Sequence, residues 1–226
     1  ELMIRTFAYS FAEKVPKSVR PAENVVIHYC DLYLRSDCYR PITSEFNSGQ
    51  LEAFNSWINS GAKIYLWDYW NMGGINYFNP PRIETGIDAI IEDIKFFTSQ
   101  NVVGIKTEYQ LDPLKPQMFF ALDNYVAAQL MYDVKQDPEM LIKRFMDGYY
   151  GAAAQEMLEV LNMIREGVKT HPEQQLSMRV KHWHFLNEEF LLKLWNLLEK
   201  AESKTEGAYR QHVQNEMITP LWTIIS

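Results

Sequence analysis

Long apolar runs, basic runs and cysteine are all scarce in this sequence. No stretch approaches the roughly 20 consecutive apolar residues that a membrane span requires, and the first residues lack the charged and apolar regions of a signal peptide. The chain carries 22 Lys and Arg against 29 Asp and Glu, a formal charge of -7, and these charges are scattered. This charge pattern argues against nucleic acid or an anionic membrane surface as a partner.

The two cysteines, Cys30 and Cys38, are too few for a disulfide scaffold and lack the spacing of a zinc site. They fit either two free thiols or one short loop disulfide, so they do not indicate a cellular compartment. Apolar and aromatic residues are abundant, at 47% and 14% of the 226 residues. A chain of this length and composition can bury a well-packed core.

Four β-rich runs, each bounded by turn residues, lie in the first half of the chain. They cover residues 3–9, 24–30, 62–68 and 101–108. Segments 48–61 and 83–101, between these runs, carry apolar residues at helical spacing, and Thr85 is the expected N-cap of the second segment. Strands alternating with helices predict a parallel sheet of βαβ units. Segment 10–23 has two prolines and no helical stripe, which predicts an irregular crossover.

Beyond Pro116 the pattern becomes helical. The predicted helices cover 117–133, 138–151, 152–169, 174–202 and 205–219. The inward stripe of the first is Phe119, Leu122, Tyr125, Val126 and Leu130. Asp137 is the expected cap of the second, with Pro138 at its first position. We therefore predict an α/β region over 1–116 and a helical extension over 117–226 that packs on it.

Four parallel strands followed by helices fit an open doubly wound sheet or half of a (β/α)₈ barrel. The doubly wound sheet would normally place a phosphate-binding glycine loop after its first strand, and "AYSFAEK" has none. We favour the C-terminal half of a barrel, because the strands precede a helical extension and "ELMIRTFAYSF" enters a strand pattern at once. The remainder of a longer parent chain or a second copy is then expected to cover the open barrel edges.

Polar side chains gather at the carboxyl ends of the predicted strands, which is where barrels place their sites. Asp68 and Glu108 are the predicted catalytic carboxylates and, if they assist hydrolysis, are expected on the same side of a cleft. Alternation places Lys106 on the same face as Glu108. Aromatic rings around the glycine-bearing loop after Asp68 are suited to stacking on sugars. The predicted substrate-binding residues are Tyr9, His28, Tyr69, Trp70, Tyr77, Lys106 and Tyr109.

Each principal candidate also has a structural interpretation. Glu108 could form an ion pair with Lys106 or Arg5, and Asp68 could cap the turn before "NMGG". His28 could be a satisfied core residue. The sequence leaves these alternatives open.

Several other residues are expected to be structural. Trp67 alternates away from Asp68 and should pack in the core against a helix, while Asp31 should cap a turn. His182 and His184 have the spacing of metal ligands on a strand but fall in a predicted helix, so no metal site is expected. The chain shows no nucleotide-binding loop or nucleophile elbow, and we predict no cofactor.

The stretches "TFAYSF", "IYLWDYW", "VVGIKTEYQ" and "DPEMLIKRFMDGYYGAAA" add a family resemblance. They are similar to the C-terminal part of an uncharacterised domain family from secreted, glycoside-hydrolase-like proteins of gut Bacteroidetes. The larger members of that family resemble barrel glycosidases such as the alpha-glucuronidases. The similarity covers about residues 5–200. It implies a TIM-type barrel followed by helices, which acts on or binds polysaccharide in the periplasm or at the cell surface.

The resemblance also implies roles for two residues. In alpha-glucuronidases, acidic residues near the ends of the last barrel strands assist an attacking water, and Asp68 and Glu108 match those positions. The general acid of these enzymes comes from an earlier strand, which this chain does not contain. Three functions are therefore compatible with the sequence: half of a glycosidase site, a non-catalytic carbohydrate-binding module, and a structural scaffold.

Overall fold

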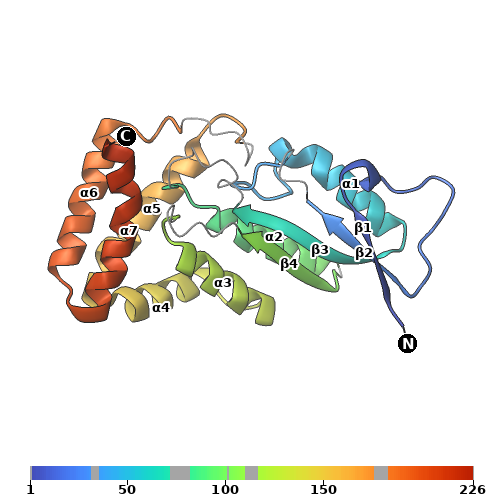
Figure 1. Cartoon of the computed structure of the whole chain (residues 1–226), viewed down its shortest axis with the longest axis horizontal. Coiled ribbons are helices and arrows are strands. Elements are labelled where there is room, and N and C mark those ends of the chain that lie inside the picture. Colours follow the sequence, from blue (N-terminus) through green and yellow to red (C-terminus); the bar gives the residue numbers. More distant parts are fainter. Residues whose placement is uncertain are drawn as a thin grey trace.

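The computed structural model describes residues 2–31, 36–71, 82–100, 102–109, 117–175 and 183–225. Four parallel strands form one sheet in chain order, as Figure 1 shows. They are β1 (Ile4–Ala8), β2 (Val25–Cys30), β3 (Lys63–Asn71) and β4 (Gly104–Tyr109). The predicted fold class is confirmed, because the sheet has the arrangement of half a (β/α) barrel and is followed by helices.

The crossovers differ in how well they cover the sheet. The β2–β3 connection contains the 3-10 helix η2 (Glu45–Asn47) and α1 (Ser48–Asn59), and the β3–β4 connection contains α2 (Ile87–Ser99). Between β1 and β2 the chain forms only the short 3-10 helix η1 (Ser10–Ala12), as its prolines predicted. Strand β1 is correspondingly exposed to solvent, and Ala8 is its one buried residue.

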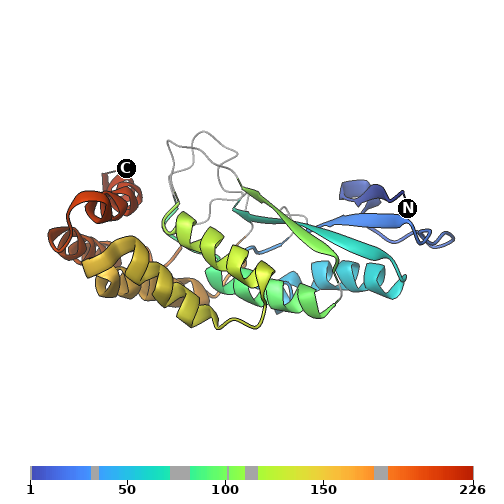
Figure 2. The same ribbon diagram turned by 90° about the horizontal axis from the view of Figure 1, so that it is seen from below.

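Helices α1 and α2 lie on the same side of the sheet (Figure 2). Alternating strand residues point toward them, as the paired positions Tyr29 and Leu66 illustrate. This side forms an apolar core with the two helices, whose members are Ala8, Ile27, Tyr29, Ile42, Phe54, Trp57, Ile64, Leu66 and Phe97. Thr85 accepts a hydrogen bond from the Ile87 N–H at the start of α2, close to its predicted capping role.

The helical extension contains α3 (Phe120–Tyr132), α4 (Pro138–Tyr150), the 3-10 helix η3 (Gly151–Ala153), α5 (Ala154–Thr170), α6 (Glu188–Ser203) and α7 (Gly207–Ile225). The predicted cap at Asp137 is confirmed, because its Oδ1 accepts from the N–H groups of Glu139 and Met140. In the described ranges no helix is both long and apolar enough to span a lipid bilayer.

The predicted helix over 174–202 is wrong at its start. Residues 174–175 and 183–187 are not helical, and α6 begins only at Glu188, where the Asn187 side chain caps the Phe190 N–H. His184 lies in an exposed turn. His182 is outside the described residues.

Helix α2 joins the extension to the α/β region. Its isoleucines belong to a large apolar cluster with residues of α3, α4, α5 and α6, and Trp70 of β3 is a member of the same cluster. The five positions predicted as the apolar stripe of α2 are all buried: Ile87, Ile90, Ile91, Ile94 and Phe97. The helical extension therefore packs on the α/β region mainly through α2.

Gly167 in α5 offers a test of the packing within the helical extension. A Cβ built on Gly167 would lie 2.5 Å from the Phe185 ring, whereas a Cβ on the exposed Gly148 of α4 meets nothing within 4 Å. We expect Gly148→Ala to stabilise the fold by about 0.5–1 kcal/mol through helix propensity. Gly167→Ala should instead destabilise it by about 1–3 kcal/mol, because overpacking outweighs propensity. Urea unfolding measures both changes, and equal signs would contradict the close contact.

Candidate functional site

The side of the sheet opposite α1 and α2 is lined by aromatic and charged residues. We call it the open face, because no described helix lies over it (Figure 2). Strand pairing places its members side by side across the four strands, with Phe7 opposite His28 and Trp67 opposite Lys106. The aromatic and charged residues of the open face include Arg5, Phe7, Tyr9, His28, Tyr65, Trp67, Tyr69, Lys106 and Glu108.

Trp67 lies at the centre of the open face. Its ring is nearly parallel to those of Tyr9 and Tyr69, with centroid distances of 5.7 and 5.6 Å. Its Nε1–H donates to Glu108 Oε2 at 2.9 Å, and the Lys106 Nζ lies 4.7 Å from the ring centroid. The prediction that Trp67 packs in the core against a helix is therefore wrong.

Glu108 is only partly buried and sits at the carboxyl end of β4. Among the described residues it makes no ion pair with Lys106 or Arg5, because those cations lie over aromatic rings. Lys106 is over Trp67, and the Arg5 guanidinium is 5.2 Å from the Tyr65 ring centroid. The indole N–H of Trp67 instead orients the carboxylate.

His28 is the buried floor of the open face, with 7% of its surface exposed. Its ring lies 5.4 Å from that of Phe7 and 4.6 Å from that of Tyr65. Burial, followed by the positive charges of Arg5 and Lys106, lowers the pKa of His28. The imidazole is therefore neutral at neutral pH, which argues against a cationic ligand-binding group. It is not the satisfied core residue of the structural interpretation either, because its buried Nε2 has no hydrogen-bond partner among the described residues.

Asp68 lies on the opposite side of the sheet from Glu108. In the β3–β4 register Asp68 pairs with Thr107, whereas Glu108 pairs with Tyr69. Successive residues of a strand point to opposite faces, so Asp68 points toward the helices. The prediction that the two carboxylates share one side of a cleft is wrong for this reason. Both still lie near the carboxyl end of the sheet.

The Asp68 carboxylate is buried, with 6% of the residue exposed. Its Oδ1 accepts from the Tyr69 N–H at 2.7 Å, and its Oδ2 accepts from the Trp70 Nε1–H at 2.8 Å. Trp70 is thus also on the helix side, where its polar atom is already used. These contacts give Asp68 a local structural role of the capping kind.

Two further buried carboxylates belong to the same region. Gln50 donates to Asp31 Oδ1 at 3.3 Å, and the Ile42 N–H donates to Asp93 Oδ1 at 2.7 Å. Burial is the largest cause that raises the pKa of Asp31, Asp68 and Asp93. Within the described ranges no group of three or more His, Cys, Asp or Glu residues could hold a metal.

The remaining predicted site residues divide between described and undescribed parts. Tyr69 is on the open face but buried, beside Cys30. Tyr77 lies outside the described residues. The backbone of Tyr109 ends β4 opposite Asn71, but its side chain is outside the described part of the chain. Cys30 and Cys38 are both free thiols, and burial raises the pKa of Cys30 to about 12.

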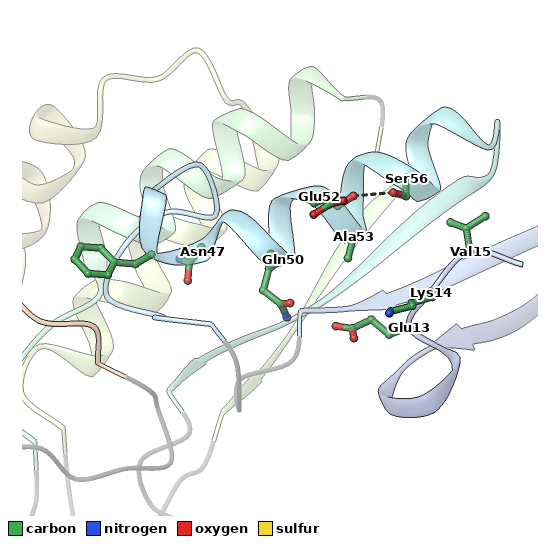
Figure 3. A pocket seen from close by; sticks show the side chains of 10 residues that line it. Glu13, Lys14, Val15, Asn47, Gln50, Glu52, Ala53 and Ser56 are labelled. Carbon is green, nitrogen blue, oxygen red and sulfur yellow. Dashed lines mark hydrogen bonds between the residues drawn. The ribbon is translucent and has the colours of Figure 1, made fainter. Parts of the chain in front are cut away.

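A separate pocket of about 500 Å³ lies between the first crossover and α1 (Figure 3). Glu13 and Lys14 line it from the crossover, and Asn47, Gln50 and Ser56 line it from η2 and α1. None of these residues was predicted as a site residue. The signal available in the sequence was the helix-free crossover, which leaves this flank of α1 uncovered.

Comparison with curated proteins and with solved structures finds no match to this chain. A family model described as "Domain of unknown function (DUF4838)" matches residues 1–178. The matched range contains all four strands and the helices as far as α5, and therefore the whole open face, whereas α6 and α7 lie beyond it. Because this match spans more than half of the sequence, the chain belongs to the DUF4838 family.

Proposed function

We propose that the open face is the carbohydrate site of a glycoside-hydrolase-like module, with Glu108 as its carboxylate. The observation that carries the proposal is the hydrogen bond from Trp67 Nε1 to Glu108 Oε2, at 2.9 Å. It joins the stacked rings of Tyr9, Trp67 and Tyr69, which we call the aromatic platform, to an acid at the carboxyl end of a parallel strand. Barrels carry their sites at this end. Rings of this kind stack on the C–H surfaces of sugars, and nearby polar groups bind the hydroxyls.

The proposed chemistry is glycosidic bond hydrolysis. One carboxylate activates water or attacks the sugar, while a second carboxyl group protonates the leaving oxygen. Glu108 takes the first role, since Trp67 fixes one of its oxygens and leaves the other for the reacting group. Asp68 does not supply the second, because it points to the other side of the sheet. That acid comes from outside the described strands, so these strands provide half of a site.

A non-catalytic carbohydrate-binding module is the second candidate. It is favoured by the open face itself, on which Glu108 is the one carboxylate among the described strand residues. A single carboxylate suffices to bind sugar hydroxyls but not for two-carboxylate hydrolysis. In either case we propose that the protein acts on polysaccharide outside the cytoplasm, as the family resemblance implies.

Truncation of the aromatic platform tests both candidates together. We expect Trp67→Ala to weaken polysaccharide binding at least tenfold, because it removes the stacking surface and the donor to Glu108. Isothermal titration against a panel of soluble plant and host glycans measures this loss. Trp222→Ala is the matched control, since Trp222 is a half-exposed tryptophan on α7, away from the sheet. Equal losses in the two variants, or no binding by the parent protein, would contradict the proposal.

Glu108→Gln distinguishes the two candidates in the same experiment. It keeps the shape of the side chain but removes its charge. If the module hydrolyses glycans, this variant should release reducing ends at least about 100-fold more slowly while binding is retained. Binding that depends on Trp67, with no release of reducing ends by the parent protein, would identify the binding module instead.

A further inference from the structure

The open face is basic, although the chain as a whole is acidic. The chain carries 22 Lys and Arg against 29 Asp and Glu. On the open face, alternation along the described strands places three cations, Arg5, Lys63 and Lys106, and one carboxylate, Glu108. A local charge opposite to that of the rest of the protein attracts ligands of negative charge. The charge of the open face therefore favours an anionic ligand over a neutral one.

Two of these cations are placed near His28, and the three residues come from three strands. The Arg5 guanidinium lies 5.2 Å from the Tyr65 ring centroid, and the His28 ring lies 4.6 Å from the same ring. Trp67 joins the other pair, because its ring is 6.2 Å from that of His28 and 4.7 Å from Lys106 Nζ. Both cations are exposed, and neither forms an ion pair with another described residue. They are thus available to a ligand.

His28 adds an unused polar atom to this group. The residue is 7% exposed, and its buried Nε2 has no hydrogen-bond partner among the described residues. A buried polar nitrogen in this state costs free energy unless a ligand or a water satisfies it. Because Nε2 lies at the end of the ring away from the backbone, it is directed from the sheet toward the open face. The imidazole is therefore a third donor beside the two cations.

The rings around His28 differ in how firmly they are held. Tyr65 packs over Gly104, where an added Cβ would lie 2.6 Å from the tyrosine ring. Phe7, 5.4 Å from the imidazole, belongs to the edge strand β1 and is 55% exposed. Exposed side chains change rotamer within nanoseconds and without disturbing a packed core. Rotation of Phe7 would therefore open His28 Nε2 to a ligand, while Tyr65 remains in place.

We propose that Arg5, His28 and Lys106 bind the anionic group of a charged sugar, a carboxylate or a sulfate. The inference rests on the proposed carbohydrate function and adds the class of glycan. Stacking occupies the face of a guanidinium and leaves the N–H groups at its edge free, so Arg5 can donate to the anion from its position over the ring. The Lys106 ammonium has three donors, and neutral His28 donates through Nε2. The aromatic platform then holds the adjoining sugar ring.

Pairs of glycans that differ in charge test the proposal with the chain as it exists. Pectate carries carboxylates, and fully methyl-esterified pectin is the same chain without them. Dextran sulfate and dextran form the corresponding pair for sulfate. Isothermal titration should show that the protein binds the charged member at least tenfold more tightly in one pair or in both. The pair that shows the preference identifies the anionic group.

Inorganic sulfate is the probe of the anion site alone. Nuclear magnetic resonance of the nitrogen-15-labelled histidine rings resolves each imidazole of the protein. Added sulfate should shift the Nε2 resonance of His28, because the anion accepts a hydrogen bond from it. This measurement needs no sugar, so it separates the anion site from the carbohydrate function.

Two double variants with the same change of charge show whether the effect is local. Arg5→Gln combined with Lys106→Gln should reduce the preference for the charged glycan to less than about twofold. Lys95→Gln combined with Lys193→Gln is the matched control, since these exposed lysines lie on α2 and α6, away from the open face. The control should keep the preference. Circular dichroism verifies that both double variants are folded.

The dependence of sulfate binding on pH gives a readout that a structural role of His28 would not produce. Burial and the charges of Arg5 and Lys106 lower the pKa of His28 in the free protein, whereas a bound anion favours the protonated ring. Arg5 from β1, Tyr65 from β3 and Lys106 from β4 are the charged or titratable groups that face it. Affinity for sulfate should rise at least threefold from about pH 7.5 to about pH 5.5. His28→Gln, which keeps a terminal donor, should abolish this rise.

The outcomes separate this inference from the function on which it rests. Equal binding of charged and neutral glycans, or an equal loss of preference in the two double variants, would overturn the anion site and leave carbohydrate binding intact. A sulfate titration that leaves the His28 resonance unchanged would also overturn it. A shifted His28 resonance in a protein that binds no glycan would support the anion site and contradict the carbohydrate function.

Discussion

Replacement of Glu216 by alanine should lower the free energy of unfolding by about 3–5 kcal/mol, because it leaves two buried hydrogen-bond donors without a partner. Glu216 Oε2 accepts from the Phe119 N–H at the start of α3, and its Oε1 accepts from the Tyr150 hydroxyl at the end of α4, both at 2.8 Å. One side chain of α7 thus satisfies donors on two other helices. A loss of this size should lower the melting temperature by about 10 °C or more.

Two further variants separate the contributions of the Glu216 contacts. Tyr150→Phe removes one donor but keeps the Phe119 contact, and it leaves Glu216 Oε1 without the hydroxyl that donates to it, so it should cost about 1–3 kcal/mol, less than Glu216→Ala. Glu199→Ala, on the exposed side of α6, is the matched control and should change stability by less than about 0.5 kcal/mol. A cost below about 1 kcal/mol for Glu216→Ala would show that the two donors find other partners.

Stability should fall by several kcal/mol between pH 5 and pH 8, and the three buried carboxylates beside the sheet contribute a large part of the fall. Burial also raises the pKa values of Asp37, Asp123 and Glu216, which act in the same direction. Burial, and then the charge of Asp68, raises the pKa of Asp31 to about 7, and burial raises the pKa of Asp68 to about 6. Burial raises the pKa of Asp93 as well. All three start from a value of 3.8.

The sign follows from proton binding. Between the unfolded and folded pKa values the folded state holds more protons than the unfolded state, so stability decreases as pH rises through this window. One unit of pKa shift corresponds to about 1.4 kcal/mol. Asp31→Asn keeps an oxygen that can accept from Gln50 and removes one titration, so urea unfolding of this variant should show a distinctly smaller loss between pH 5 and pH 8.

Glu156→Gln is a control, because the pKa of Glu156 is shifted in the opposite direction to those of Asp31, Asp68 and Asp93. Although burial acts to raise the pKa of Glu156, hydrogen bonds from Lys204 and Lys200 lower it overall. Its stabilising contribution is therefore lost as pH falls below the ordinary range of a glutamate, and the variant should keep the parent slope between pH 5 and pH 8. An Asp31→Asn variant with the parent slope would contradict the assignment to the buried carboxylates.

The elements of the fold were largely predictable because their signals are local. The isoleucine stripe of α2 and the Asp137–Pro138 start of α4 both reflect short-range geometry, and both are present. The start of α6 was missed although its signal was also local. Asn187 followed by Glu188 and Glu189 is a typical N-cap with an acidic first turn, and the predicted start at residue 174 did not take it into account.

The candidate site was only half predictable because it depends on register. Alternation correctly placed Lys106 and Glu108 on one face of β4. Whether Asp68 shares that face depends on its pairing with Thr107, which no local pattern reveals. The residue types along β3 do not distinguish its two sides either, because Ile64 and Leu66 on the helix side alternate with Tyr65 and Trp67 on the open face. A strand with apolar residues on both sides does not show which one faces a ligand.

The position of α2 has a consequence for cooperativity. One edge of this helix contributes Phe97 to the core under the sheet, and its isoleucines contribute to the core of the helical extension. Unfolding of either region would expose part of α2 and remove packing contacts from the core of the other region. The two regions therefore share part of the free energy of unfolding, and we expect them to unfold together although the chain pattern changes at Pro116.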